Sequence, residues 1–243
     1  MKIFIRTKVD SINSFIELAL KYNTGIELSL SFQDIDKGFN FDILKGVDVT
    51  VHAPFFDVSI ASHNPYVRNR SIEILKDTVK MCDILNPYNI VVHHNYSPFV
   101  YNFDENYYSN RFFENFSKVL EDKKGNYSIT FENVFETDSS IGKKIIELFK
   151  DEGIGLCFDC GHFNLFSGIP LKRWLDDWGD KIYEMHIHNN YGYRDDHNPL
   201  DMGVIDIKRL LQIYKPKYLT IENRNIEDTV RSLEFLGSMD VGS

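Results

Sequence analysis

The sequence predicts one closed barrel of eight parallel strands that alternate with helices, a (β/α)8 TIM barrel. Three observations support this fold. Short apolar runs of strand type alternate with amphipathic helical patterns along the chain. The length of 243 residues is normal for such a barrel. No linker, low-complexity run or internal repeat divides the sequence, so we expect residues 1–243 to form a single domain.

The expected strands are short, and most are rich in β-branched or aromatic residues. In chain order they are residues 2–5 (KIFI), 25–30 (GIELSL), 48–52 (DVTVH), 89–93 (NIVVH), 128–132 (SITFE), 155–159 (GLCFD), 183–188 (YEMHIH) and 218–222 (YLTIE).

Helical periodicity fills most of the gaps between these strands. The expected helices are residues 12–22, 66–85, 106–120, 140–150, 171–178, 207–214 and 226–236, and only the connection 34–44 lacks a clear pattern. An open nucleotide-binding sheet would normally carry a glycine-rich loop after its first strand. The first turn here, RTKVDS, contains no glycine, which favours the closed barrel.

Composition narrows the classes of function. The net charge of −9 argues against a broad basic surface for nucleic acid. No apolar stretch is long enough to span a membrane, and the N-terminal segment turns polar too early for a signal peptide, so we expect a cytoplasmic protein. The three cysteines are Cys82, Cys157 and Cys160. A redox role for the last two, as a CxxC pair, is disfavoured because Cys157 lies within a strand pattern rather than at a helix N-terminus.

Most of the expected strands end in a residue that can bind metal. These residues are His52, His93, Glu132, Asp159, His186 or His188, and Glu222. In a barrel the carboxyl ends of all strands meet on the catalytic face. The pattern therefore predicts that these side chains converge.

Strand alternation sharpens this prediction, because neighbouring residues point to opposite faces. Glu132, Asp159, His186 and His188 take the inner face, while the apolar residues between them face the helices. Several buried carboxylates need a positive partner. Mixed imidazoles and carboxylates are ligands for zinc, manganese or iron.

Two local spacings add candidates. His162 follows Asp159 by three residues, and Asp195 and His197 stand two apart in the loop after the seventh strand. Each residue alone has an ordinary interpretation, such as a solvated loop histidine or an ion pair of Glu132 or Glu222 with Arg194 or Arg224. We expect His63 to lie on the surface and His94 to face away from His93.

In order and spacing these motifs resemble the xylose-isomerase-like barrel superfamily, which includes endonuclease IV (AP endonuclease family 2) and sugar or sugar-phosphate isomerases and epimerases. The resemblance covers about residues 49–222. It implies a metal site at VHAPF (His52), VVHHNY (His93), FEN (Glu132), FDCGHF (Asp159, His162), MHIHNN (His186), DDHNPLDMGVID (Asp195, His197) and IEN (Glu222).

The chain departs from the family pattern at several points. Asp201 replaces the glycine after Pro-Leu, and Asn189 stands where an aspartate is common. The position resembling a DNA-inserting tyrosine is Phe55. The early loops are short and lack the insertions with which endonuclease IV members probe DNA.

Two enzyme classes fit the resemblance. An isomerase or epimerase would use one ion on Glu132, Asp159, His186 and Glu222, with Glu132 or Glu222 moving a proton and His162 holding substrate. A phosphodiesterase would use all nine residues for two or three ions. The ligand count favours the second class.

Acidic charge and short loops instead favour a small sugar or sugar phosphate over nucleic acid, and on these grounds the isomerase is the preferred prediction. A barrel that binds a ligand without turning it over is the third option. The sequence does not determine the oligomeric state.

Overall fold

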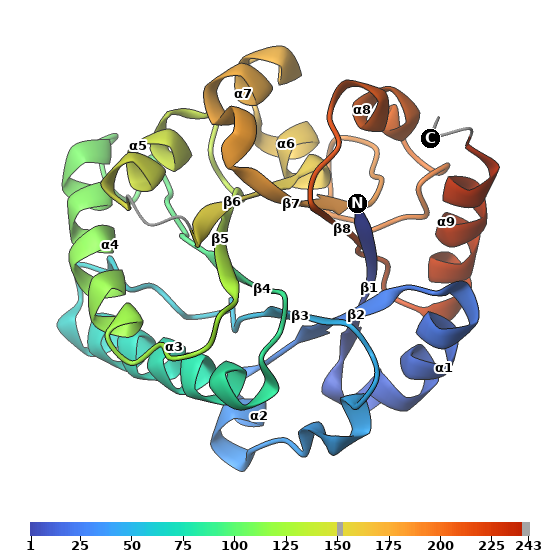
Figure 1. The fold of residues 1–243 in the computed structure, drawn as a ribbon. Coiled ribbons are helices and arrows are strands. Elements are labelled where there is room, and N and C mark those ends of the chain that lie inside the picture. The colour runs from blue at the N-terminus through green and yellow to red at the C-terminus, as the bar shows by residue number, and fades with distance from the viewer. Residues whose placement is uncertain (150–152, 240–243) are drawn as a thin grey trace.

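A computed structural model describes residues 1–149 and 153–239. Its strands form a closed barrel in the order β1-β2-β3-β4-β5-β6-β7-β8, all parallel, which confirms the predicted fold. Figure 1 shows the strands as a central ring with the helices outside it. That residues 1–243 form a single domain stays a prediction. No helix in the described part of the chain has the length and apolar character that crossing a membrane requires.

The strands lie close to their expected positions. They are β1 (Lys2–Lys8), β2 (Gly25–Ser29), β3 (Val49–His52), β4 (Asn89–His93), β5 (Ser128–Glu132), β6 (Ile154–Asp159), β7 (Ile182–Ile187) and β8 (Tyr218–Ile221). The main difference is in β1, which continues past the expected end at Ile5. Arg6, Thr7 and Lys8 pair with Glu27, Leu28 and Ser29 of β2, so half of the expected first turn belongs to the strand.

The helices are α1 (Ile12–Tyr22), α2 (Phe32–Lys37), α3 (Pro65–Leu85), α4 (Glu105–Leu120), α5 (Ser140–Leu148), α6 (Cys160–Phe166), α7 (Leu171–Trp178), α8 (Ile207–Ile213) and α9 (Ile226–Ser238), with 3-10 turns at Val9–Ser11, Phe41–Leu44 and Gly179–Lys181. The sequence predicted neither α2, which overlaps the connection without a clear pattern, nor α6, which begins directly after β6 inside the motif that carries Asp159 and His162. The expected helix 140–150 ends at Leu148, and residue 150 lies outside the described residues.

The layer between strands and helices is apolar. Phe131 of β5, for example, packs edge-on against Phe112 and Phe116 of α4, with ring centroids 5.0 and 4.9 Å apart. Each such side chain contributes roughly 1.5–3 kcal/mol when fully buried. This layer holds the barrel together and leaves the interior free for polar residues.

The interior of the barrel is polar above an aromatic floor. At the amino ends of the strands, the ring of Phe4 packs against Tyr88 and Tyr218, at centroid distances of 6.2 and 6.0 Å. Above this floor lie the buried side chains of Glu27, Thr50, Asn89, Thr130, Glu184 and Thr220. The carboxyl ends of the strands are therefore separated from solvent at the amino end.

The two cysteines of the CxxC motif are buried and free. Cys157 lies in β6 and Cys160 begins α6. Burial raises the pKa of both thiols, which opposes the thiolate that redox chemistry requires. That the two cysteines have no redox role stays a prediction.

Candidate metal centre

The nine candidate ligands converge at the carboxyl ends of the strands. His52, His93, Glu132, Asp159 and His186 lie at or near the ends of β3 to β7, Glu222 directly follows β8, His162 lies in α6, and Asp195 and His197 lie in the loop after β7. All are buried except Asp195, whose side chain is 37% exposed. Close contacts between imidazole nitrogens and carboxylate oxygens link all nine in one network.

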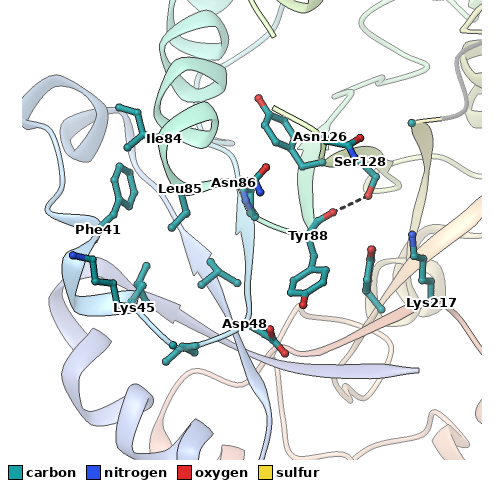
Figure 2. A pocket seen from close by; sticks show the side chains of 18 of the residues that line it. Phe41, Lys45, Asp48, Ile84, Leu85, Asn86, Tyr88, Asn126, Ser128 and Lys217 are labelled. Atoms are coloured by element: carbon teal, nitrogen blue, oxygen red, sulfur yellow. Dashed lines mark hydrogen bonds between the residues drawn. The ribbon is translucent and has the colours of Figure 1, made fainter. Parts of the chain in front are cut away.

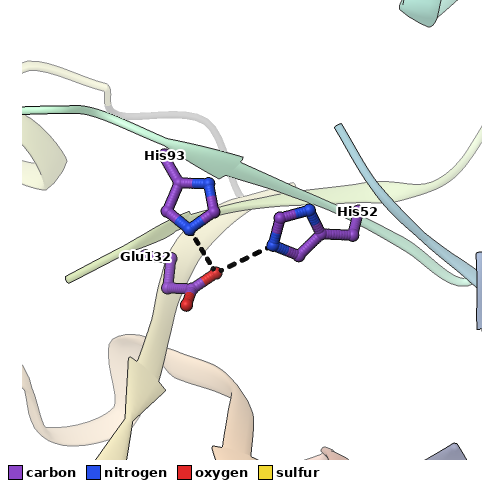
Figure 3. Close-up of side chains that lie close together, drawn as sticks. All are labelled: His52, His93 and Glu132. Atoms are coloured by element: carbon purple, nitrogen blue, oxygen red, sulfur yellow. Dashed lines mark ion pairs between the residues drawn. The ribbon is translucent and has the colours of Figure 1, made fainter. Parts of the chain in front are cut away.

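Glu132 is the centre of the network. Its Oε2 lies 3.5 Å from His52 Nε2, 3.2 Å from His93 Nε2 and 3.4 Å from His186 Nδ1. Figure 3 shows the carboxylate of Glu132 facing the first two imidazoles. The other oxygen, Oε1, lies 3.4 Å from His162 Nδ1. One carboxylate thus faces four imidazoles from four different strands or helices.

A second group surrounds Glu222. Its Oε1 lies 3.3 Å from His186 Nδ1 and 3.4 Å from Arg6 Nε. Because His186 Nδ1 faces both Glu132 and Glu222, this nitrogen joins the second group to the first.

A third group forms around Asp195. Asp195 Oδ2 lies 2.9 Å from His197 Nε2 and 3.6 Å from His162 Nε2, while its Oδ1 lies 3.6 Å from His188 Nε2. Asp159 joins this group, because its Oδ1 lies 3.4 Å from His188 Nε2 and 3.6 Å from His162 Nδ1. Asp159 therefore belongs to the third group.

Backbone carbonyls orient three of the imidazoles. The Nδ1 atoms of His52, His162 and His197 lie 3.0, 2.9 and 2.8 Å from the carbonyl oxygens of Ala53, Asn133 and Glu222. A hydrogen on each Nδ1 can donate to that carbonyl, which leaves the lone pair on Nε2 directed into the network. This arrangement is typical of histidines that bind metal.

Asparagines next to the ligands fix the loops that carry them. Asn133 follows Glu132 and exchanges two hydrogen bonds with the backbone of Asp159. Asn223 follows Glu222 and donates to the carbonyl of His197. Asn189, which replaces the expected aspartate, donates to the carbonyls of Leu200 and Ile205 and so closes the loop that holds Asp195 and His197.

Three carboxylates of this network, those of Glu132, Glu222 and Asp195, have pKa values below their ordinary range. Burial alone would raise the pKa of Glu132, but the imidazoles of His93 and His186 hold that pKa well below its ordinary value. Burial is likewise outweighed at Glu222, whose pKa Arg6 and His186 lower, and at Asp195, whose pKa His162 and His197 lower. The centre thus concentrates negative charge.

The imidazoles differ in protonation. Burial lowers the pKa of His93 to about 4, so this ring is neutral and available as a ligand. Burial also opposes the charged forms of His162 and His186, but neighbouring groups, Asp159 beside His162 and Cys157, Glu27 and Glu132 beside His186, raise their pKa values. A metal ion would compete with these protons for the same nitrogen atoms.

Many polar atoms of the centre have no hydrogen-bond partner. Within residues 1–149 and 153–239, buried atoms of this kind include both carboxylate oxygens of Glu132, Asp159 Oδ2, Asp195 Oδ1, Glu222 Oε1, His93 Nδ1, His186 Nδ1 and both ring nitrogens of His188. Leaving such atoms unpaired is costly. Divalent cations with nitrogen and oxygen ligands would satisfy most of them, so the residues present fit a metal centre.

Several residues of the site were missed from the sequence. His188 was assigned to the inner face but not proposed as a ligand, and Arg6 was assigned to a turn. Glu27 and Glu184 lie below the centre, where Glu27 Oε2 is 3.2 Å from His186 Nε2 and burial raises the pKa of Glu27 to about 7. Strand alternation, continued over all residues of β1, β2 and β7, would have identified these four.

Other expectations concerned residues around the centre. Arg194 contacts Asp196 and Arg224 donates to the carbonyl of Asp195, so neither pairs with Glu132 or Glu222 as the ordinary interpretation required. His63 is exposed, as expected. His94 faces away from the centre and lies 2.6 Å from Glu136.

Phe55 occupies the position that resembles the DNA-inserting tyrosine of endonuclease IV members. Its ring packs on His93, with ring centroids 4.1 Å apart. This aromatic side chain covers a candidate ligand.

A pocket lies at the opposite end of the barrel (Figure 2). Its lining includes Asp48, Tyr88 and Lys217, which directly precede β3, β4 and β8. In (β/α)8 enzymes the chemistry takes place at the carboxyl ends of the strands, and the amino ends serve stability. This pocket is therefore separate from the candidate metal centre.

Comparison with known proteins agrees with the geometry. Residues 43–238 match the family described as xylose isomerase-like TIM barrel. An uncharacterized protein of Methanocaldococcus jannaschii is 32% identical over 206 residues, which cover 78% of this chain and 69% of the relative.

Two solved structures share the fold. A D-tagatose 3-epimerase-like protein has a TM-score of 0.76 and 26% identity, over 98% of this chain and 96% of the other. Endonuclease IV from Thermus thermophilus has a TM-score of 0.73 and 15% identity, over 98% of each chain.

Proposed function

Because the chain belongs to the xylose isomerase-like TIM barrel family, we propose that it is an enzyme with a centre of two or three divalent ions that hydrolyses a phosphoester of a small substrate. The observation that carries this proposal is the position of Glu132. Both its oxygens lack hydrogen-bond partners within the described residues, and they face imidazoles on different sides. A carboxylate placed in this way can bridge ions.

The ligands divide naturally into three sets. His52 and His93 would hold one ion with Glu132, and His186 and Glu222 would hold a second with the same carboxylate. Asp195 and His197 would hold a third, together with Asp159 and His162 or His188. Mixed imidazole and carboxylate ligands suit zinc, manganese or iron. A single ion would leave His52, His93, Asp195 and His197 without a clear role.

The residues of the chain then have defined tasks. Divalent ions would activate water near neutral pH and stabilise negative charge on phosphoryl oxygens. Glu132 would hold the ions at a fixed spacing. The Nδ1 contacts of His52, His162 and His197 with backbone carbonyls would keep their Nε2 atoms aimed at the ions. The rings of Phe4, Tyr88 and Tyr218 close the barrel at the amino ends of the strands. Substrate would therefore enter from the carboxyl ends.

A second candidate is the sugar or sugar-phosphate isomerase or epimerase preferred from the sequence. The observation that favours it is the 26% identity to a D-tagatose 3-epimerase-like protein over nearly the whole chain. One ion would be held by Glu132, Asp159, His186 and Glu222, and Glu132 or Glu222 would transfer a proton between adjacent carbons. His162 would then contact substrate.

Metal stoichiometry combined with two assays separates these candidates. We would measure metal in the purified protein by inductively coupled plasma spectrometry. Hydrolysis would be followed on bis(p-nitrophenyl) phosphate and on an abasic-site oligonucleotide. Deuterium exchange from solvent would be followed into ketose sugars and their phosphates.

The proposal expects two or three ions per chain and hydrolysis of the small phosphodiester in excess of oligonucleotide nicking. One ion per chain with exchange at a sugar carbon would replace it by the isomerase. Efficient nicking of the oligonucleotide would keep the chemistry but reject the small substrate.

A further inference from the structure

Arg6 lies at the edge of the candidate metal centre. Along β1, Phe4 and Arg6 point into the barrel, because Phe4 packs on the buried ring of Tyr218, which shares a strand face with the interior Thr220, and residues two apart share a face. Arg6 stands opposite Glu27 of β2 in the strand register. Arg6 therefore reaches the centre from β1, which lies between β8 and β2 in the barrel.

The guanidinium of Arg6 makes few contacts. Its Nε lies 3.4 Å from Glu222 Oε1 but has no hydrogen-bond acceptor within the described residues, and its Nη2 donates to Ser29 Oγ at 3.4 Å. A guanidinium has five N–H donors. The side chain is 24% exposed, whereas that of Glu222 is 3% exposed. Arg6 thus faces both the ligands and the open side of the centre.

Other arginines near this face are engaged elsewhere. Arg224 donates to the carbonyl of Asp195, Arg194 contacts Asp196, and Arg68 donates to the carbonyls of Ser62 and His63. Among the arginines of residues 1–149 and 153–239, Arg6 is the one that forms an ion pair with a candidate ligand, Glu222.

We propose that the guanidinium of Arg6 binds a phosphate group of the substrate. This phosphate would lie beside the ion that Glu222 would hold. An ion bound to Glu222 would share the charge of that carboxylate, so the guanidinium would then face a centre that is no longer strongly negative. The planar fork of arginine matches two phosphate oxygens. This inference rests on the proposed function, since it needs a metal-loaded centre.

Binding of inorganic phosphate to the metal-replete protein tests the proposal without any turnover. Isothermal titration calorimetry would compare wild type with Arg6→Gln, which removes the charge, and Arg6→Lys, which keeps it but loses the fork. Arg173→Gln is the matched control, because Arg173 is exposed on α7, which carries none of the candidate ligands, and its guanidinium pairs with Asp177. Metal content and thermal unfolding would be measured for each variant.

We expect Arg6→Gln to weaken phosphate binding roughly 10- to 100-fold, as loss of a charge-assisted hydrogen bond predicts. Arg6→Lys should fall in between, and Arg173→Gln should bind like wild type. Bound metal should not change. Dimethyl phosphate and glycerol 3-phosphate, used as further probes, would show whether a diester or a monoester is the preferred source of the anion.

Three results would overturn the proposal. Wild type that binds no phosphate would exclude an anion site. Unchanged affinity in Arg6→Gln would exclude a contact with the anion. Loss of metal in Arg6→Gln would assign Arg6 to the positioning of Glu222 alone. If the hydrolysis assays fail but phosphate binding still depends on Arg6, only the hydrolase proposal is rejected. The isomerase with a phosphorylated substrate then becomes the better account.

Discussion

At the scale of single residues, the carboxylate of Glu132 explains why so many histidines can share one small volume. It lies between imidazoles of β3, β4, β7 and α6, and its charge offsets any proton they carry. The same carboxylate is buried, and neither of its oxygens has a hydrogen-bond partner within the described residues. The residue is therefore suited to binding ions and poorly suited to a purely structural role.

We predict that Glu132→Gln removes turnover and leaves the fold intact. The amide keeps the shape of the side chain but loses the charge that would hold ions or accept a proton, so turnover should fall by about two orders of magnitude or more. Steady-state kinetics and metal analysis would measure the effect, with circular dichroism to check the fold. Glu73→Gln, at an exposed position on α3, is the control. Full activity and metal content in Glu132→Gln would reject the assignment.

The sequence predicted the candidate ligands better than their surroundings. In the sequence, the end of a strand can be recognised as the polar residue that terminates an apolar run. This signal identified residues such as His93 and Glu132. Arg6 was missed because a strand that continues on alternating polar residues looks like a turn. The precise partners, such as the approach of Asp159 to His188, depend on loop geometry that strand patterns do not encode.

At the scale of elements, helix α6 packs closely at Gly161 against the residue that follows strand β7. A Cβ on Gly161 would overlap the ring of His188. The sequence predicted the motif around Gly161 but not the helix, since α6 begins directly after β6 with no intervening loop.

We predict that Gly161→Ala displaces His188 and destabilises the protein by about 1–3 kcal/mol, as overpacking usually does. Metal held near Asp195 should be lost preferentially. Urea unfolding and metal analysis would measure both effects. Gly237→Ala is the matched control, because its Cβ would meet open space on α9, and it should be neutral or stabilising by up to about 1 kcal/mol. Equal stability of the two variants would contradict the close packing.

A second element contact joins helix α3 to the turn before β5. The carboxylate of Asp83 accepts hydrogen bonds from the backbone N–H groups of Lys124 and Gly125 and from the Tyr127 hydroxyl. Partial burial opposes the charged form of Asp83, but these donors outweigh it and hold the pKa below its ordinary value. A depressed carboxyl pKa contributes stability above the unfolded pKa, and this contribution is lost as pH falls through the folded pKa.

We therefore predict that Asp83→Asn lowers the free energy of unfolding by about 1–3 kcal/mol at pH 7. The difference from wild type should shrink as the pH falls below about 4, where the unfolded carboxyl takes up a proton. Denaturation curves at several pH values would test this, with Asp77→Asn at an exposed site of the same helix as the control. A constant difference across the pH range would show that charge on Asp83 is not the cause.

At the scale of the whole molecule, the fold was predictable because two signals agreed. The alternation of strand and helix patterns defined the barrel, and the polar residues at strand ends defined which face carries the chemistry. The polar interior was not predicted in full, because residues such as Thr50 and Asn89 look ordinary in a strand until closure of the barrel places them together.

We predict that removal of metal destabilises the whole protein. Ions that bind only the native state stabilise it by mass action, about 2.7 kcal/mol at a concentration 100 times the Kd. Complete removal by a chelator should thus lower the Tm by roughly 5–10 °C for a chain of this size. Differential scanning calorimetry would record the shift, and added zinc or manganese should reverse it. An unchanged Tm after verified metal removal would argue that the buried carboxylates need no ions.

Closure of the barrel between β1 and β8 has a consequence for biosynthesis. Lys2 pairs with Tyr218, and Arg6 meets Glu222, so the first and last strands complete the centre together. A nascent chain that has released only its first seven strands exposes His52, His93 and Glu132 without Glu222 to complete the centre. Contacts between such distant residues form late and slowly. The residues of the candidate centre can therefore come together only after β8 has left the ribosome, and an ion that needs Glu222 would be bound only after that point.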